Sequence, residues 1–180
     1  MAQRKYVRDV WALGPNQTGY PGGFPKGLVS AIKKRWWGQK RLWVFSGGFK
    51  DSGGTTVDIK PECHPDFVAN AEQLPFEDNS FDFVMLDPPY SEQEAQELYG
   101  LHHPSMVKIL NEMARVTAPG GTCILLHRLI PSVHPQFNNH WKRLYLKAVI
   151  GVFTIAGMTN MRALTVWGKQ VPLMTRDDKG

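Results

Sequence analysis

The sequence has little cysteine: among 180 residues there are two, Cys63 and Cys123, which lie far apart and form no CxxC pair. This usage indicates neither a disulfide framework nor a zinc site and fits a reducing compartment. No apolar run approaches the roughly 18 residues of a membrane span, and residues 1–14 lack the apolar stretch of a signal peptide. We therefore expect a soluble, cytoplasmic protein with no membrane partner.

The chain also has no internal repeat, no low-complexity tract and no histidine spacing such as HExxH, so we expect no metal ion. A length of 180 residues suits one domain with a core of its own. We predict a single domain over residues 1–180, without a separate target-recognition domain. Within it we expect a basic segment and a helix at 1–38, a sheet core at 39–170 and a flexible tail at 171–180.

The net charge of +5 is unevenly distributed. Residues 1–41 carry nine basic side chains against a single acid, whereas residues 51–100 carry twelve acids against a single base. The stretches "KKRWWGQKR" (33–41) and "WKR" (141–143) interleave bases with tryptophan, a pattern typical of surfaces that neutralise phosphates and stack bases. The alternative is the solvated face of a helix with packed rings, and the sequence leaves both open.

Apolar runs alternate with helical periodicity along the chain. Helices are expected at 24–37 and 104–116, and strands at 41–48, 54–59, 67–70, 81–86, 122–127, 146–155 and 161–168. Near-continuous apolar strands separated by helices predict an α/β fold with a largely parallel sheet covered on both faces.

Polar residues stand where four of these strands end. They are Ser46-Gly47-Gly48, Asp58, Asn70 and Asp87. Because ligands of open α/β sheets bind outside the carboxyl ends of the strands, we expect all four to line one crevice. Glycine allows close backbone approach, and an acid after the second strand suits ribose hydroxyls. Taken singly, each also fits a turn or a helix cap.

The stretch "FDFVMLDPPY" (81–90) drives an apolar strand into a carboxylate. Proline has no N–H and a fixed φ, so Pro88 and Pro89 end the strand and stiffen the turn. Asp87 and Tyr90 are thereby held at the end of a strand. His127 ends the next long strand and is a second residue that could face a substrate, although a structural histidine is as compatible with that position.

The chain resembles the class I S-adenosylmethionine-dependent methyltransferases, and within them the amino-methyltransferases with a D/N/S-P-P-Y/F motif. The resemblance runs from "YPGGFP" (20–25) to "LTVWGK" (164–169) and includes "WVFSGG", "TVDI", "ANAEQLPFEDNSFDFVMLDPPY" and "ARVTAPGG". It implies a single-domain Rossmann-like sheet of seven strands, the last antiparallel, with helices on both faces. Two features depart from the family: the glycine pattern is not F-x-G-x-G, and Asn70 replaces an acid.

The resemblance implies S-adenosylmethionine as the cofactor and assigns two sets of residues. The catalytic set is Asp87, Pro88, Pro89 and Tyr90. The cofactor-binding set is Tyr20, Phe24, Pro25, Phe45, Ser46, Gly47, Gly48, Asp58, Ile59, Asn70, Ala71 and Asp87.

The same resemblance implies methyl transfer to an exocyclic amine of a nucleobase. The Asp87 carboxylate and the Pro88 carbonyl would accept its N–H groups, and Tyr90 would stack on the base. Adenine N6 in DNA is the preferred target, with a recognition partner or a homo-oligomer supplying sequence preference. Three alternatives stay open: an RNA amino-methyltransferase acting on adenine N6 or guanine N2, a small-molecule or protein methyltransferase suggested by "LPFEDNSFD", and a binding module without activity.

Overall fold

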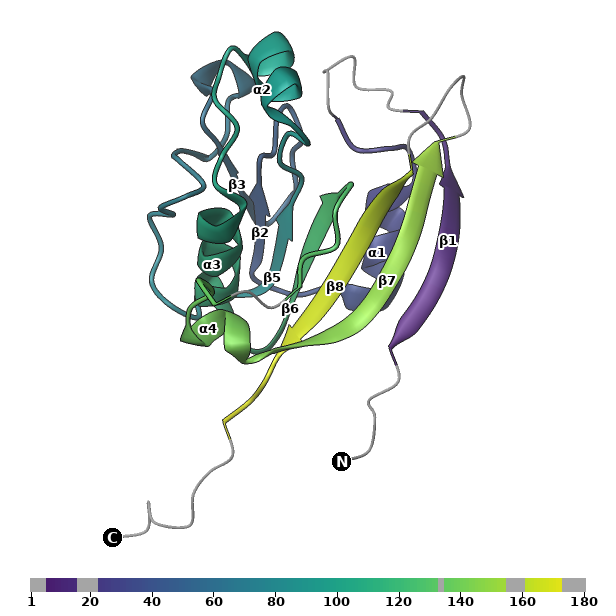
Figure 1. Cartoon of the computed structure of the whole chain (residues 1–180), viewed down its shortest axis with the longest axis vertical. Coiled ribbons are helices and arrows are strands. Elements are labelled where there is room, and N and C mark those ends of the chain that lie inside the picture. Colours follow the sequence, from purple (N-terminus) through teal and green to yellow (C-terminus); the bar gives the residue numbers. More distant parts are fainter. Residues whose placement is uncertain (1–5, 16–22, 133–134, 155–160, 173–180) are drawn as a thin grey trace, which may run out of the picture.

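A single sheet organises the computed structural model, which describes residues 6–15, 23–132, 135–154 and 161–172 (Figure 1). The strands of this sheet are β1 (Val7–Leu13), β2 (Arg41–Val44), β3 (Gly54–Asp58), β4 (Phe67–Val68), β5 (Phe81–Leu86), β6 (Thr117–His127), β7 (Leu144–Thr154) and β8 (Arg162–Lys169). The α-helices in the described residues are α1 (Leu28–Trp36), α2 (Glu92–Tyr99), α3 (Met106–Val116) and α4 (Asn139–Lys142), and Pro61–Cys63 forms a 3₁₀ turn.

The strand order is β1-β7-β8-β6-β5-β2-β3-β4. Strand β8 runs antiparallel to both of its neighbours, and the other pairings are parallel. The mostly parallel α/β sheet with an antiparallel last strand is therefore confirmed. Strand β3 follows β2 in the chain and pairs with it on one side, whereas β5 comes later and pairs with β2 on the other side. The strand order therefore reverses between β2 and β5, which is the switch point of the sheet.

The predicted count of seven strands was wrong, because β1 adds an eighth at the edge, parallel to β7. This strand lies within the segment 1–38, where only a basic segment and a helix were expected. Only Trp11 of its seven residues is buried, so "VRDVWAL" shows no clear alternation of apolar and polar residues. The edge strand is thus held by backbone pairing more than by burial of its side chains.

Helices cover both faces of the sheet, with α1 on one side and α3 and α4 on the other (Figure 1). On the α1 face, Leu28 and Ile32 are fully buried in a cluster that includes Trp43 of β2 and Phe83 of β5. On the other face, α3 contributes Ile109, Leu110 and Met113 to a second cluster. Each of the two helices therefore buries an apolar side against the sheet.

The tryptophans of the two basic clusters pack against the protein. Trp36 stacks on Trp11 with ring centroids 6.1 Å apart, and Trp37 lies 5.7 Å from Phe83. Trp141 is only 3% exposed. The stretch 33–41 also leads into the first residue of β2, at the opposite end of that strand from the carboxyl-end crevice. These contacts support the packed-ring alternative, which the sequence had left open beside a base-stacking surface.

The connection from β2 to β3 is unusually short for two parallel strands. It spans residues 45–53 and contains no helix, whereas parallel crossovers commonly need a dozen or more residues. Asp51 anchors it: the carboxylate accepts hydrogen bonds from Arg41 Nε at 2.6 Å and from Trp43 Nε1 at 2.9 Å. A Cβ at Gly54 would collide with that carboxylate. The sequence departs from the F-x-G-x-G pattern because this turn is short and is held by the ion pair between Arg41 and Asp51.

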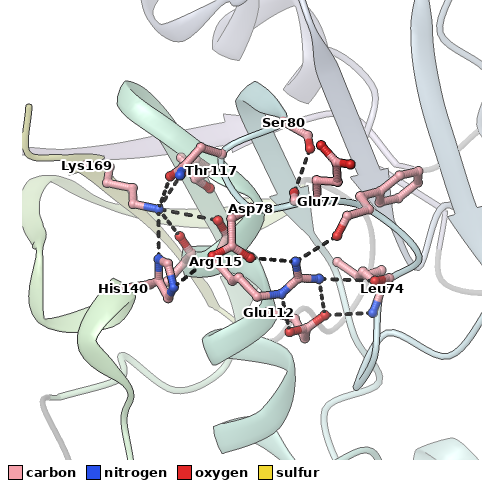
Figure 2. A network of polar contacts seen from close by, with 12 residues as sticks. Leu74, Glu77, Asp78, Ser80, Glu112, Arg115, Thr117, His140 and Lys169 are labelled. Atoms are coloured by element: carbon pink, nitrogen blue, oxygen red, sulfur yellow. Dashed lines mark hydrogen bonds and ion pairs between the residues drawn. The ribbon is translucent and has the colours of Figure 1, made fainter.

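A buried lysine closes the carboxyl end of α3 (Figure 2). Lys169 of β8 is 1% exposed, and its ammonium donates hydrogen bonds to the carbonyl oxygens of Ala114 at 2.7 Å and Thr117 at 2.6 Å, and to Asn79 Oδ1 at 2.8 Å. A cation is favoured there because the last carbonyls of a helix carry partial negative charge. This contact fixes α3 to the last strand of the sheet.

Arg115 fastens the segment between β4 and β5 to α3 (Figure 2). Its guanidinium donates to the carbonyl oxygens of Leu74 at 3.1 Å and Phe76 at 2.7 Å, and pairs with Asp78 at 3.0 Å and Glu112 at 2.7 Å. A planar guanidinium with five N–H donors suits this many acceptors. The stretch "LPFED" thus has a structural explanation in this fold.

Candidate active site

A cavity of about 300 Å³ opens where the carboxyl ends of β2, β3, β4 and β5 meet. The expected crevice is therefore present, at the switch between β2 and β5. The cavity brings together nine residues of the predicted cofactor-binding set: Phe24, Phe45, Ser46, Gly47, Asp58, Ile59, Asn70, Ala71 and Asp87.

The turn after β2 is shaped by two left-handed residues, Phe45 with φ 58° and Gly47 with φ 49°. The non-glycine outlier stores strain, which proteins tolerate mainly at ligand sites. The turn is held by the Gly47 N–H, which donates to Asp58 Oδ2 at 2.8 Å. The Ser46 hydroxyl is buried and has no hydrogen-bond partner among the described residues. This hydroxyl is therefore available to hydrogen-bond a ligand in the cavity.

Two residues of the predicted cofactor set do not line this cavity, and a third is not among the described residues. Gly48 is exposed and does not line the cavity, because the turn points it outward. Pro25 lines a neighbouring cavity instead. Tyr20 lies outside the described residues.

That second cavity, of about 290 Å³, adjoins the first and shares Asp87 and Pro89 with it. It is lined by Pro15, Gly23, Pro25, Asp87, Pro88, Pro89, Tyr90, Glu94, Tyr99, Thr154 and Arg162. The whole D-P-P-Y stretch therefore faces this second space. Asp87 stands at the boundary between the two cavities.

Asp87 is a buried carboxyl group with unequal oxygens. Oδ1 accepts a hydrogen bond from the Tyr90 hydroxyl at 2.7 Å, whereas Oδ2 is buried with no partner among the described residues. Burial raises the pKa of Asp87 to about 7, against the lowering effects of the Tyr90 hydrogen bond and the positive charge of Arg162. At neutral pH this carboxyl can both take up and release a proton.

Tyr90 is enclosed by its neighbours. Its hydroxyl accepts a hydrogen bond from Arg162 Nη1 at 3.1 Å. The His127 ring packs edge-on against the Tyr90 ring with centroids 5.3 Å apart, and the Arg128 guanidinium lies 5.1 Å from the centre of the Tyr90 ring. Burial and the Asp87 charge raise the pKa of Tyr90 well above its usual value, so the hydroxyl keeps its proton. The side chain is a fixed wall of the second cavity.

Helix α2 supplies residues to both cavities that the sequence analysis missed, because no helix was expected between the strand at 81–86 and the helix at 104–116. A local signal was present. Ser91 caps the helix by accepting from the Glu94 N–H at 3.1 Å, and Gly100 ends it at φ 66°. The pattern S-x-x-E followed by a glycine is a helix signature. Arg162, in contrast, reaches the site only through the pairing of β8 with β6, which no local pattern reveals.

The histidines near the site do not form a metal centre, and the described part of the chain holds no cluster of His, Cys, Asp and Glu suited to a metal ion. His127 is 1% exposed, and burial lowers its pKa to about 4, which leaves it neutral. Its Nδ1 accepts from the Leu129 N–H at 3.0 Å. Within the described residues no helix is long and apolar enough to cross a bilayer.

Fold, strand order and cavity position together are those of the class I S-adenosylmethionine-dependent methyltransferase fold. A family model described as "Methyltransferase domain" matches residues 55–125, the stretch from β3 to β6. This match contains the second-strand acid and the D-P-P-Y motif.

The relatives and solved structures agree with that class. The demethylmenaquinone methyltransferase of Staphylococcus haemolyticus is 39% identical over 85 residues, which cover 47% of this chain and 30% of that protein. The matched stretch thus spans between 23% and 30% of the length of such relatives. A SAM-dependent methyltransferase of Methanosarcina mazei superposes with a TM-score of 0.50 at 16% identity, over 78% of this chain and 98% of the other. A chain from the complex with the Haloferax volcanii Trm112 methyltransferase activator gives 0.55 at 15% identity, over 82% and 90%.

S-adenosylmethionine is accordingly the cofactor of this domain, and the first cavity has the chemistry to hold it. Asp58 offers carboxylate oxygens for ribose hydroxyls, Asn70 offers an amide for a purine edge, and Ser46 has an unpartnered hydroxyl. The volume of about 300 Å³ is at the lower end of that of ligand pockets. These residues would bind the nucleoside portion and leave the reactive end toward Asp87.

Proposed function

We propose that this chain transfers a methyl group from S-adenosylmethionine to an exocyclic amine of a nucleobase, with adenine N6 in DNA as the first candidate. The observation that carries the proposal is the position of Asp87: it joins the cofactor cavity to a second cavity lined by the rest of the D-P-P-Y motif. A planar heterocycle entering that second cavity would bring its amine to a carboxyl group with an unpartnered oxygen.

The cofactor supplies an activated methyl group. The chain supplies acceptors for the amine: the Asp87 carboxylate, together with the Pro88 carbonyl, would take its N–H bonds and stabilise the positive charge that develops on nitrogen. A carboxyl with a pKa of about 7 can then hold the proton that the nitrogen releases. Excluding water from the buried carboxyl strengthens these interactions.

Tyr90 is proposed to contact the ring of the substrate from the side of the second cavity. Because its hydroxyl is bound to both Asp87 and Arg162, the ring is held in one orientation before substrate arrives. A fixed aromatic wall lowers the entropic cost of positioning the substrate.

A second candidate is methylation of a small ring molecule. It is favoured by the demethylmenaquinone methyltransferase relatives and by the packing of the tryptophans at 33–41 and 141–143, which removes one argument for nucleic acid. If the substrate is DNA, we propose that a partner protein or a second copy of the chain aids recognition, as an activator accompanies the Haloferax volcanii neighbour. RNA is the third substrate class to test.

The test is transfer of a labelled methyl group to duplex DNA, single-stranded DNA, RNA and demethylmenaquinol in parallel, with product analysis. Wild type is compared with Asp87→Asn and with Glu97→Gln, an exposed acid on α2 that lines neither cavity. We expect N6-methyladenine in DNA, lost in Asp87→Asn and retained in Glu97→Gln. Label found in RNA alone, or in the quinol alone, would show that RNA or the quinol, and not DNA, is the substrate. No label in any arm, with the cofactor bound, would contradict the proposal.

A further inference from the structure

Three side chains from distant parts of the chain form a line of hydrogen bonds at the second cavity. Arg162 Nη1 of β8 donates to the Tyr90 hydroxyl at 3.1 Å, and that hydroxyl donates to Asp87 Oδ1 at 2.7 Å. The Arg162 side chain is half-buried, and its guanidinium makes no other hydrogen bond to the described residues. The contact spans 72 positions in the sequence and is no by-product of local folding.

The direction of this line is fixed by chemistry. A guanidinium can only donate, so the Tyr90 oxygen must accept from Arg162. The single hydroxyl hydrogen is then free to point to Asp87 Oδ1, which stabilises negative charge on that oxygen. The opposite oxygen, Oδ2, has no donor among the described residues. It is therefore the more basic oxygen of the carboxylate.

We infer that Arg162 is a positioning residue that acts through Tyr90 to favour the ionised form of Asp87 before reaction and to direct the incoming proton to Oδ2. The inference rests on the proposed function for its use in catalysis. The substrate nitrogen uses its lone pair to form the bond to the methyl group, while the S–CH₃ bond breaks and its electron pair stays on sulfur, which leaves as a neutral thioether. The nitrogen then loses a proton and keeps the electron pair of the broken N–H bond. Asp87 Oδ2 takes that proton, and the carboxylate becomes a neutral acid.

Other ionisable groups surround the carboxyl and could compete with this role. They are Glu94 and Tyr99 of α2, His103 after that helix, His127 and Arg128 at the end of β6, and Asp58 at the end of β3. Glu94 opposes Arg162, because its negative charge favours the protonated form of Asp87. Arg128 lies over the Tyr90 ring but does not bind its hydroxyl, which makes it a matched control for a nearby cation.

The experiment is a ¹³C NMR titration of the Asp87 carboxyl in protein labelled at aspartate, without cofactor or substrate. Asp87→Asn identifies the signal. Wild type is compared with Arg162→Met, Arg162→Lys, Tyr90→Phe and Arg128→Met, each checked for native circular dichroism. We expect the midpoint to rise by about half a pH unit or more in Arg162→Met and Tyr90→Phe, since each removes an interaction that favours the charged form. Arg162→Lys should shift it less than Arg162→Met does, and Arg128→Met should not shift it.

A shift in Arg162→Met no larger than in Arg128→Met would overturn the inference, as would an unchanged midpoint in Tyr90→Phe. If Arg162→Met does not fold, Tyr90→Phe and Arg162→Lys still decide the question. A second measurement uses the substrate found by the transfer assay: the acidic limb of kcat/KM should move to higher pH in Arg162→Met, with activity regained at high pH. Because the titration needs no turnover, failure of methyl transfer and failure of this inference give different results.

Discussion

Gly47 and Asp58 join two strand ends of the first cavity: the Gly47 N–H donates to Asp58 Oδ2 at 2.8 Å. The other oxygen, Oδ1, accepts from the Lys60 N–H at 3.0 Å. The carboxylate is therefore held at a fixed angle by backbone donors on both sides, while its remaining lone pairs are available to a ligand. One acid thus shapes the turn after β2 and offers acceptors to a ribose.

Replacing this acid tests the cofactor site. Asp58→Ala should weaken binding of S-adenosylmethionine by roughly 10- to 100-fold, because hydrogen bonds to a charged group contribute about 1.5–3 kcal/mol. Calorimetric titration with the cofactor measures the change. Glu62→Gln is the control, since that side chain is 66% exposed and lines neither cavity. Equal affinities for Asp58→Ala and wild type would remove Asp58 from the cofactor site.

The buried Asp87 carboxyl should make stability depend on pH. Its pKa rises from 3.8 to about 7 in the folded protein because of burial, so the fold prefers the protonated form. The stability that this form contributes is present below pH 4 and is lost as pH rises to 7. The free energy of unfolding of Asp87→Asn minus that of wild type should therefore grow by a few kcal/mol between pH 4 and 7, at about 1.4 kcal/mol per unit, and then level off.

Urea unfolding of the two proteins at half-unit steps of pH gives this difference. Asp66→Asn provides the contrasting control, because hydrogen bonds from the Thr56 N–H and hydroxyl lower the pKa of Asp66. Its contribution is present above pH 4 and is lost below that pH, where the Asp87 contribution is already constant. A difference between Asp87→Asn and wild type that stays flat from pH 4 to 8 would mean that the carboxyl is not desolvated.

The strand ends of the site were predictable because each depends on a few adjacent residues. Apolar runs ending at Ser46, Asp58, Asn70 and Asp87 reach the same edge of a parallel sheet, and the neighbouring positions of β5, β2, β3 and β4 bring these ends together. Two features could not be read in the same way. Strand β1 buries only Trp11, so it carries almost no periodic signal. Arg162 reaches Tyr90 only because β8 inserts between β6 and β7, a pairing decided by the whole sheet.

The role of the basic clusters could not be decided from the sequence for a related reason. Interleaved bases and tryptophans have the same composition whether the rings face solvent or the core. Trp37 lies on Phe83, and Arg41 is withdrawn into an ion pair with Asp51. Composition predicts a nucleic-acid surface only when the rings are exposed, and ring burial depends on contacts made across the fold.

The capped end of α3 predicts a large loss of stability in Lys169→Met. The change leaves the carbonyl oxygens of Ala114 and Thr117 without their buried donor, at a cost of about 1–3 kcal/mol for each unsatisfied group. Chemical unfolding at pH 7 should show a drop of roughly 2–4 kcal/mol in the free energy of unfolding. Lys142→Met, an exposed lysine on α4, should stay within about 0.5 kcal/mol of wild type. Equal stability of both variants would show that water replaces the ammonium.

The N-cap of α2 links helix stability to the shape of both cavities. Ser91→Ala removes the acceptor for the Glu94 N–H and should lower the free energy of unfolding by about 1 kcal/mol. Because Tyr99 of this helix lines both cavities, cofactor affinity should fall a few-fold as well. Ser105→Ala is the matched control: Ser105 is the N-cap residue of α3 but makes no side-chain capping bond, so its loss should change neither quantity. If Ser91→Ala lowers stability without altering cofactor affinity, α2 forms the cavity wall independently of its first turn, and the cap is structural only.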